Sequence, residues 1–231
     1  MKKLIALLLA LIAAPAAADI VSAKYGEPTT RYDHGILGDA IEYGALKLRL
    51  DNGDPILIRL PKSRVFEDLA PRLADVDGDG NFEVIVIETS VTLGAQLAIY
   101  DETGKIASTP FLGRNYRWLA PIGAVDLDGD GLIEIAYIEK PHLTKELKVW
   151  RFKDGALEFV AALGNLTNHS IGQDFISGGI RNCGDGPEII TADASWQKVM
   201  ATRLQGGKLT TRSLGPLDDL ARMKSALACK L

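Results

Sequence analysis

Several features are scarce in this chain. Only two of its 231 residues are cysteine, three are histidine and 6% are aromatic. Basic residues are outnumbered, with 26 Lys and Arg against 30 Asp and Glu, so the net charge is −4. Binding nucleic acid through a basic surface requires many cations that displace phosphate counterions. We therefore expect no nucleic-acid partner, and the composition does not suggest a polytopic membrane protein.

The motifs of several enzyme classes are missing too. There is no Gly-x-Ser-x-Gly elbow, no His-Glu-x-x-His, no Cys-x-x-Cys and no phosphate-binding glycine loop. The three histidines, His34, His142 and His169, are scattered through the sequence. The sequence therefore predicts no catalytic residues and favours a non-catalytic protein.

The longest apolar run lies at the N-terminus. Lys2 and Lys3 precede an uninterrupted apolar stretch from Leu4 to Ala14, and small residues follow up to Ala18. This order is typical of a secretory signal cleaved after Ala18, and the run is too short to span a bilayer as a helix. We expect a signal peptide over 1–18, a single domain over 19–231, and a periplasmic or secreted protein with no membrane span after cleavage.

The predicted export bears on the state of the two cysteines. In an oxidising compartment an even number of cysteines usually indicates a disulfide, here between Cys183 and Cys229. Two buried thiols are the alternative.

An acidic segment occurs twice, about fifty residues apart. Its first copy runs from Leu73 to Val86 and its second from Ala124 to Tyr137. A degenerate third copy lies at 181–190, where Arg181 and Cys183 replace the first two acids. The repetition predicts one structural unit used several times.

Hairpin patterns recur with the same period. Apolar and polar residues alternate on both sides of turns at 51–54, 101–104, 153–155 and 205–207. Such alternation around Asn-Gly, Asp-Gly or Gly-Gly is a strong hairpin signal. The sequence predicts an all-β protein, a β-propeller of about four four-stranded blades with Asp-rich calcium loops. We place the blades roughly at 30–68, 69–117, 118–173 and 174–216.

Two other architectures, a five-bladed ring and an open β-solenoid, fit the same repeat. The C-terminal tail, 217–231, contains a stretch from Leu217 to Leu227 that favours a short helix. A strand that closes the first blade is its alternative.

The acidic segments have the spacing of a loop that binds a metal ion. Acids stand at positions 1, 3, 5 and 9, and the carbonyl at position 7 is free to point inwards. A hard cation such as Ca²⁺ takes six to eight oxygen ligands, and Mg²⁺ demands stricter geometry. An EF-hand is excluded because Val86 and Tyr137 stand where its bidentate Glu is required. We expect two structural Ca²⁺ sites with the ligands Asp75, Asp77, Asp79, Asn81 and Glu83, and Asp126, Asp128, Asp130, Leu132 (through its backbone) and Glu134.

The other copies are weaker. The third loop should be free of metal and held by the disulfide instead. In the first unit the segment from Asp33 to Asp39 keeps only two acids and is a weak metal-site candidate.

These segments resemble the FG-GAP, or VCBS-type, repeats of integrin-like β-propellers. The resemblance rests on Leu-Ala-Asp-Val-Asp-Gly-Asp-Gly-Asn-Phe-Glu (73–83) and Ala-Val-Asp-Leu-Asp-Gly-Asp-Gly-Leu-Ile-Glu (124–134). It implies a propeller fold and Ca²⁺ ligation by these loops. The sequence departs from the family pattern in the Glu at position 9, in the missing Gly-Ala-Pro after the strand, and in having four units instead of seven.

A polar connection at 167–175 and the segment 114–118 occupy corresponding places in successive units. Loops at one face of a propeller often carry binding sites, so Arg117 and His169 are predicted to contribute to a partner surface. The favoured function is a calcium-stabilised binding or adhesion module, and we expect it to be a monomer. The rival is a carbohydrate-binding or carbohydrate-active propeller, lectin-like or lyase-like. The ligand would then be a protein or a glycan.

Overall fold

The computed structural model describes residues 18–231, which form seventeen strands and one short helix. The predicted all-β class is confirmed. The predicted signal peptide lies outside the described residues apart from Ala18. Among the described residues, no helix has the length and apolarity needed to cross a membrane.

The first sheet contains eight strands in the order β1-β2-β4-β6-β7-β8, with β3 paired to β2 and β5 paired to β6. Their bounds are β1 (Ile20–Thr29), β2 (Glu42–Leu50), β3 (Pro55–Arg59), β4 (Arg64–Phe66), β5 (Arg72–Ala74), β6 (Glu83–Ser90), β7 (Gly94–Asp101) and β8 (Gly104–Ser108). The short strand β4 makes the sheet continuous, because it pairs with β2 at Tyr43–Phe66 and with β6 over three residues.

The second sheet has four strands in the order β12-β11-β10-β9, and the third has five, with β13-β15-β16-β17 in a row and β14 paired to β15. Their bounds are β9 (Leu119–Val125), β10 (Glu134–Glu139), β11 (Glu146–Lys153), β12 (Ala156–Leu163), β13 (Leu166–Thr167), β14 (Gly179–Asn182), β15 (Pro187–Asp193), β16 (Lys198–Gln205) and β17 (Lys208–Pro216). All pairings are antiparallel. The four predicted hairpins are present as β2–β3, β7–β8, β11–β12 and β16–β17.

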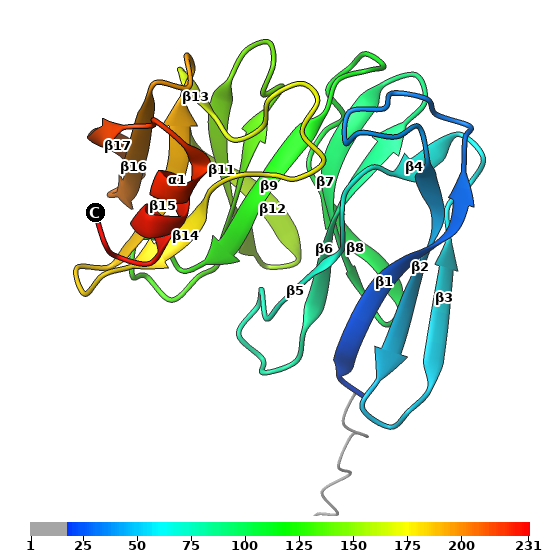
Figure 1. Ribbon diagram of the computed structural model, residues 1–231. Coiled ribbons are helices and arrows are strands. Elements are labelled where there is room, and N and C mark those ends of the chain that lie inside the picture. The colour runs from blue at the N-terminus through cyan, green and yellow to red at the C-terminus, as the bar shows by residue number, and fades with distance from the viewer. Residues whose placement is uncertain (1–17) are drawn as a thin grey trace, which may run out of the picture.

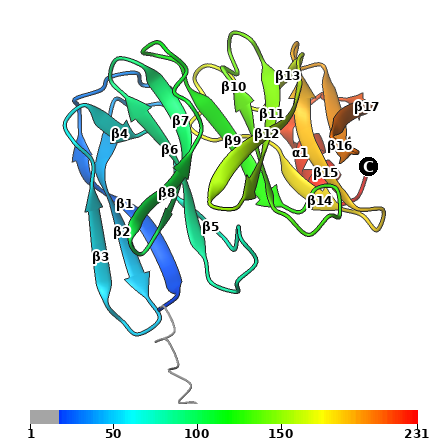
Figure 2. The same cartoon turned by 180° about the vertical axis from the view of Figure 1, so that it is seen from behind.

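The sheets follow one another along an open arc (Figure 1). Strands β3 and β17 lie at opposite ends of the molecule in both views (Figure 2). A closed ring of four separate blades is therefore not seen in residues 18–231. The first predicted unit differs most, because β1 lies before its predicted start at residue 30 and because β4 joins it to the second unit. The strand β13, placed in the third unit, pairs instead with β15 of the last sheet.

The core lies between the faces of successive sheets. The central strands β6 and β10 are buried at every residue, and one apolar cluster includes Leu97 of the first sheet, Ile138 of the second and Ile189 of the third. Burying both faces of these strands removes apolar surface from water, which is the main favourable contribution to folding. The arc is thus one packed body.

The C-terminal tail forms the helix α1 (Leu220–Leu227), as predicted, and the strand alternative is wrong. Asp219 caps it by accepting a hydrogen bond from the Arg222 backbone N–H. Met223 and Ala226 face the last sheet and pack with Ile190. The helix therefore covers the outer face of the arc's C-terminal end (Figure 1).

Candidate metal centres

Each acidic loop connects two neighbouring strands at the same end of its sheet. The first loop follows β5 and leads into β6, where Ala74 pairs with Glu83. The second follows β9 and leads into β10, where Val125 pairs with Glu134. Because the strands fix both ends of the loop, the residues at positions 1 and 9 are held close together.

Hydrogen bonds from the backbone shape the two loops in the same way. The two carboxylate oxygens of Asp75 accept from the N–H groups of Gly78 at 2.7 Å and Gly80 at 3.1 Å. Those of Asp126 accept from the N–H groups of Gly129 at 2.7 Å and Gly131 at 2.9 Å. Gly78 and Gly129 have φ values of 78° and 82°, a region that glycine enters without steric cost. The glycines therefore allow the tight curl.

The Glu at position 9 closes each loop from the sheet side. Glu83 accepts a hydrogen bond from the Val76 N–H at 2.8 Å, and Glu134 accepts one from the Leu127 N–H at 2.7 Å. Both side chains are buried. The departure from the family pattern at this position is thus accommodated identically in both loops.

Three carboxylates converge in each loop, with ligand oxygens within 4.8 Å of one another: Asp75, Asp77 and Glu83 in the first, and Asp126, Asp128 and Glu134 in the second. Oxygen atoms of this kind suit a hard divalent cation, so the donor set fits the metal that the resemblance implies. The position-5 acids, Asp79 and Asp130, fall outside these two groups. Asp79 instead accepts hydrogen bonds from Asn81, another predicted ligand.

The electrostatics of the first loop favour a cation. Burial, together with the neighbouring carboxylates of Asp77, Asp79 and Asp75, raises the pKa of Glu83 to about 7. Carboxylates that crowd one another in this way are stabilised by a cation between them. The first loop has no basic side chain within ion-pair distance in the described residues.

The second loop differs because Arg151 of β11 pairs with three of its acids. The guanidinium lies 2.5 Å from Glu134 Oε1, 2.8 Å from Asp128 Oδ2 and 2.9 Å from Asp130 Oδ2. Arg151 stands directly opposite Glu134 in the sheet. Part of the charge that a metal ion would neutralise is therefore already neutralised by the protein.

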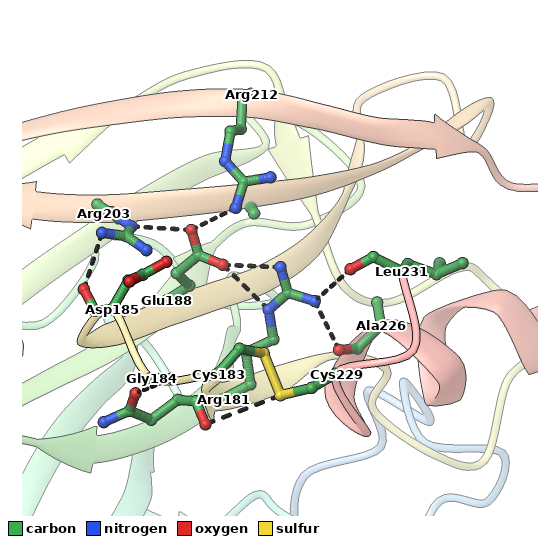
Figure 3. A network of polar contacts seen from close by, with 12 residues as sticks. Arg181, Cys183, Gly184, Asp185, Glu188, Arg203, Arg212, Ala226, Cys229 and Leu231 are labelled. Carbon is green, nitrogen blue, oxygen red and sulfur yellow. Dashed lines mark hydrogen bonds and ion pairs between the residues drawn. A yellow bond between two sulfur atoms is a disulfide. The ribbon is translucent and has the colours of Figure 1, made fainter.

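In the third loop the acid is paired with more than one guanidinium group (Figure 3). Glu188, the counterpart of Glu83, accepts from Arg181 at 2.7 Å, Arg203 at 2.8 Å and Arg212 at 2.6 Å. Burial alone would raise the pKa of Glu188, but hydrogen bonds from these three arginines outweigh it and hold the pKa at about 2. Three guanidinium groups thus surround one carboxylate in the third loop, whereas three carboxylates lie close together in each of the other two loops.

The predicted disulfide is confirmed, with Cys183 and Cys229 bonded and their Cα atoms 5.6 Å apart. It fixes the third loop to the residues after α1. Arg181 strengthens the same junction by donating to the carbonyl oxygens of Ala226 at 2.7 Å and Leu231 at 3.3 Å (Figure 3). The C-terminal residues are therefore part of the third loop's surroundings.

The weak candidate in the first unit does not form a cluster. Asp33 accepts a hydrogen bond from the Tyr116 hydroxyl, and Asp39 accepts one from the Ile41 N–H. Neither acid belongs to a group of three possible metal ligands within residues 18–231. The two acids therefore accept hydrogen bonds that stabilise the structure around them.

The predicted partner surface needs one correction. His169 is fully buried and packs edge-on against Trp118 and against the tilted ring of His142, so it cannot contact a partner directly. Arg117 is half-buried, and its guanidinium donates to the Tyr116 carbonyl at 2.8 Å. Of the two predicted residues, only Arg117 is accessible.

Sequence reasoning missed that the fold brings the histidines into one region. His142 Nε2 lies 2.8 Å from His169 Nδ1, and burial, His169 and His34 lower the pKa of His142 to about 4. His34 and His142 both line one small cavity. Their spacing in the sequence gives no signal of this, because they come from loops of three different sheets.

A buried acidic group near His34 was also missed. Glu67 is fully buried and bonds to His34, while the nearby Glu42 is 4% exposed. Burial, with Glu67, Asp39 and Asp68 in the vicinity, raises the pKa of Glu42 to about 9. Burial also raises the pKa of Glu67, although its hydrogen bonds with His34 and Thr89 act in the opposite direction.

Comparisons with known proteins agree with the loop motif. The model of the FG-GAP-like repeat matches residues 75–137, which include both acidic loops. No curated protein matches the chain. Among solved structures, the rhamnogalacturonan lyase YesW has 16% identity and a TM-score of 0.41 over 78% of this chain and 43% of its own. The Bacillus licheniformis rhamnogalacturonan lyase PL11 has 16% identity and a TM-score of 0.45 over 77% and 43%.

The chain spans less than half the length of these lyases, and the likeness is too low to carry an argument about function. The family match is different, because it falls on the same residues whose carboxylates the structure brings together. The segment 75–137 of this chain is an FG-GAP-like repeat.

Proposed function

We propose that the protein is an exported, non-catalytic binding or adhesion module stabilised by Ca²⁺. The observation that carries the proposal is the pair of loops that each gather three carboxylates within 4.8 Å on the same backbone frame. The side chains that would hold the ion are the two groups Asp75, Asp77 and Glu83, and Asp126, Asp128 and Glu134. Bound there, Ca²⁺ neutralises the acids and ties the start of each central strand to the preceding loop.

The disulfide supports export, because such bonds persist in oxidising compartments and are rare in the cytosol. The blade-like repetition of hairpins supports a propeller-type scaffold, here an open arc whose loops at one end are available to a partner. The partner belongs to the same proposal: a protein or glycan, bound by a single copy of the chain.

Thermal unfolding of the 19–231 chain without reductant tests the calcium assignment. We expect Ca²⁺ to raise Tm by several degrees over chelator, because a ligand that binds only the folded state stabilises it by mass action. Mg²⁺ should produce a smaller shift. If Ca²⁺ caused no shift in Tm and metal analysis detected no bound ion, the loops would be turns that bind no metal.

A carbohydrate-binding role is the second candidate. The observation that favours it is the exposed ring of Tyr116, which is 41% accessible and adjoins Arg117. Exposed aromatic rings and basic side chains commonly form sugar-binding surfaces. Retention on a glycan array that is lost in Tyr116→Ala would support this role, while protein partners recovered with no glycan retained would favour the first.

A further inference from the structure

The first acidic loop is tied to the start of the first strand, a contact that the proposed function does not use. The loop between β5 and β6 and the start of β1 both lie at the lower end of the first sheet (Figure 1). The N–H of Phe82, at position 8 of the loop, donates to Asp19 Oδ1 at 2.7 Å across 63 residues of sequence. A residue just before β1 thus holds the loop backbone next to Glu83.

Asp19 is itself held in place by the first hairpin. Its carbonyl oxygen accepts a hydrogen bond from the Asp51 N–H at 2.9 Å. The next residue, Ile20, is buried and pairs with Leu50 of β2. The carboxylate of Asp19 is not among the three that converge in the loop. It is therefore placed to act on a metal ion through the loop backbone.

Position 8 is held differently in the other two loops. Ile133 of the second loop packs against the main apolar cluster, and its N–H donates no hydrogen bond within residues 18–231. In the third loop the residue before Glu188 is Pro187, which has no N–H to donate. The ring of Phe82 is 42% exposed and belongs to no apolar cluster of the described residues. The bond to Asp19 therefore holds in the first loop what packing holds in the second.

We propose that Asp19 is a positioning residue of the first Ca²⁺ site and that it couples occupancy of this site to docking of the N-terminal residues. The inference rests on the proposed Ca²⁺ binding and gives the first site a contact that the second lacks. Phe82 directly precedes Glu83, so fixing its N–H restrains this ligand before the ion arrives. Order that is present before binding lowers the cost of binding.

The coupling works in both directions. If Asp19 raises the affinity of the first loop for Ca²⁺, then Ca²⁺ strengthens the contact of Asp19 with the loop by the same factor. The amides of Phe82 and Asp51 report that contact, because both donate to Asp19. We expect Ca²⁺ to slow the hydrogen exchange of both amides.

A Ca²⁺ titration of the isotope-labelled 19–231 chain, followed through its amide resonances, tests the role one loop at a time. The Gly80 N–H bonds to Asp75 in the first loop, and the Gly131 N–H bonds to Asp126 in the second, so each amide reports its own site. In Asp19→Ala we expect the affinity reported by Gly80 to fall about three- to tenfold, the size of one lost hydrogen bond. The affinity reported by Gly131 should not change.

Two further variants separate positioning from charge. Asp19→Asn loses the charge, but its amide oxygen still accepts from the Phe82 N–H, so it should keep most of the affinity. Asp54→Ala loses the same charge in the neighbouring turn, where the side chain accepts from Asn52, and should leave both sites unchanged. Dispersed amide resonances establish that each variant is folded.

An unchanged Gly80 affinity in Asp19→Ala would overturn the inference, and so would an equal loss in Asp19→Asn or an equal loss at Gly131. Slowed exchange of the Asp51 amide by Ca²⁺ that persists in Asp19→Ala would contradict the coupling. If neither glycine amide of the wild type responds to Ca²⁺, the proposed function fails and the inference with it. If both respond and the Asp19 variants have no effect, only the inference fails.

Discussion

The first and second acidic loops share a backbone and differ in the residue opposite their final Glu. Arg151 of β11 stands opposite Glu134. Continuing the registers by one residue from Val84–Tyr100 and Ile189–Thr202 places Asp101 of β7 opposite Glu83 and Arg203, which pairs with Glu188, in the corresponding position of the third loop. The difference teaches that guanidinium groups can neutralise the acids of this loop geometry, a role that we propose for Ca²⁺ where no such group is present. The loop motif by itself does not reveal which.

The largest expected effect comes from the loop that needs no metal. Glu188→Gln leaves three arginines around an uncharged amide, and removing one partner of a buried ion pair costs about 3–5 kcal/mol. We expect a loss of that order in urea unfolding, and Ca²⁺ should not restore it. A variant rescued by Ca²⁺ would show that the third loop resembles the first after all.

A smaller effect is expected from Arg151→Met, which makes the second loop resemble the first. Its guanidinium is partly exposed, so we expect a loss of about 2 kcal/mol in chelator. Ca²⁺ should recover more stability in this variant than in the wild type, because the acids are then free to bind it. Equal Ca²⁺ shifts in Tm for both proteins would contradict the idea that Arg151 competes with the metal.

Matched substitutions in the two loops compare them directly. Asp77→Asn should remove more of the Ca²⁺-induced stabilisation than Asp128→Asn, with a difference of about 1 kcal/mol, because the first loop has no guanidinium to replace the ion. The Tm of both variants, measured across a Ca²⁺ titration, gives the comparison. The reverse order would mean that Arg151 strengthens the second site.

Acid should distinguish the third loop by its pH profile. The pKa of Glu188, about 2 in the folded protein, lies below the ordinary value near 4.5. The unfolded chain therefore takes up the proton first, and the stabilisation is lost as pH falls from about 4.5 to 2. Urea unfolding over this range should show the decline in the wild type and a weaker one in Glu188→Gln. An unchanged decline in the variant would assign it to other acids.

The sequence predicted what is local and periodic. The four hairpins, the two acidic loops and α1 depend on turn residues and alternation that neighbouring positions reveal. The pairing of Cys183 with Cys229 followed from their number and from the signal segment. These features need no knowledge of what lies across the sheet.

What could not be predicted depends on contacts between distant segments. Strand β4 has only three residues, and nothing in them indicates that they pair with both β2 and β6. The role of Arg151 follows from the cross-strand register. His34 and His169 are brought to one region by loops of different units, so the sequence suggested scattered residues and an exposed His169 where the structure has a buried group.

Strand β4 also bears on how the protein opens. Through it, the strand pairing runs without a break from β1 to β8, whereas the second and third sheets are separate ladders that contact their neighbours through packed side chains and a few backbone hydrogen bonds such as that from Leu166 to Lys145. Regions of a protein open in contiguous cooperative units, and amide hydrogen exchange reports the free energy of each. The amides of β2 and β6 should therefore exchange together, as a single unit that includes two repeats. The evolutionary repeat and the cooperative unit of unfolding are then not the same length.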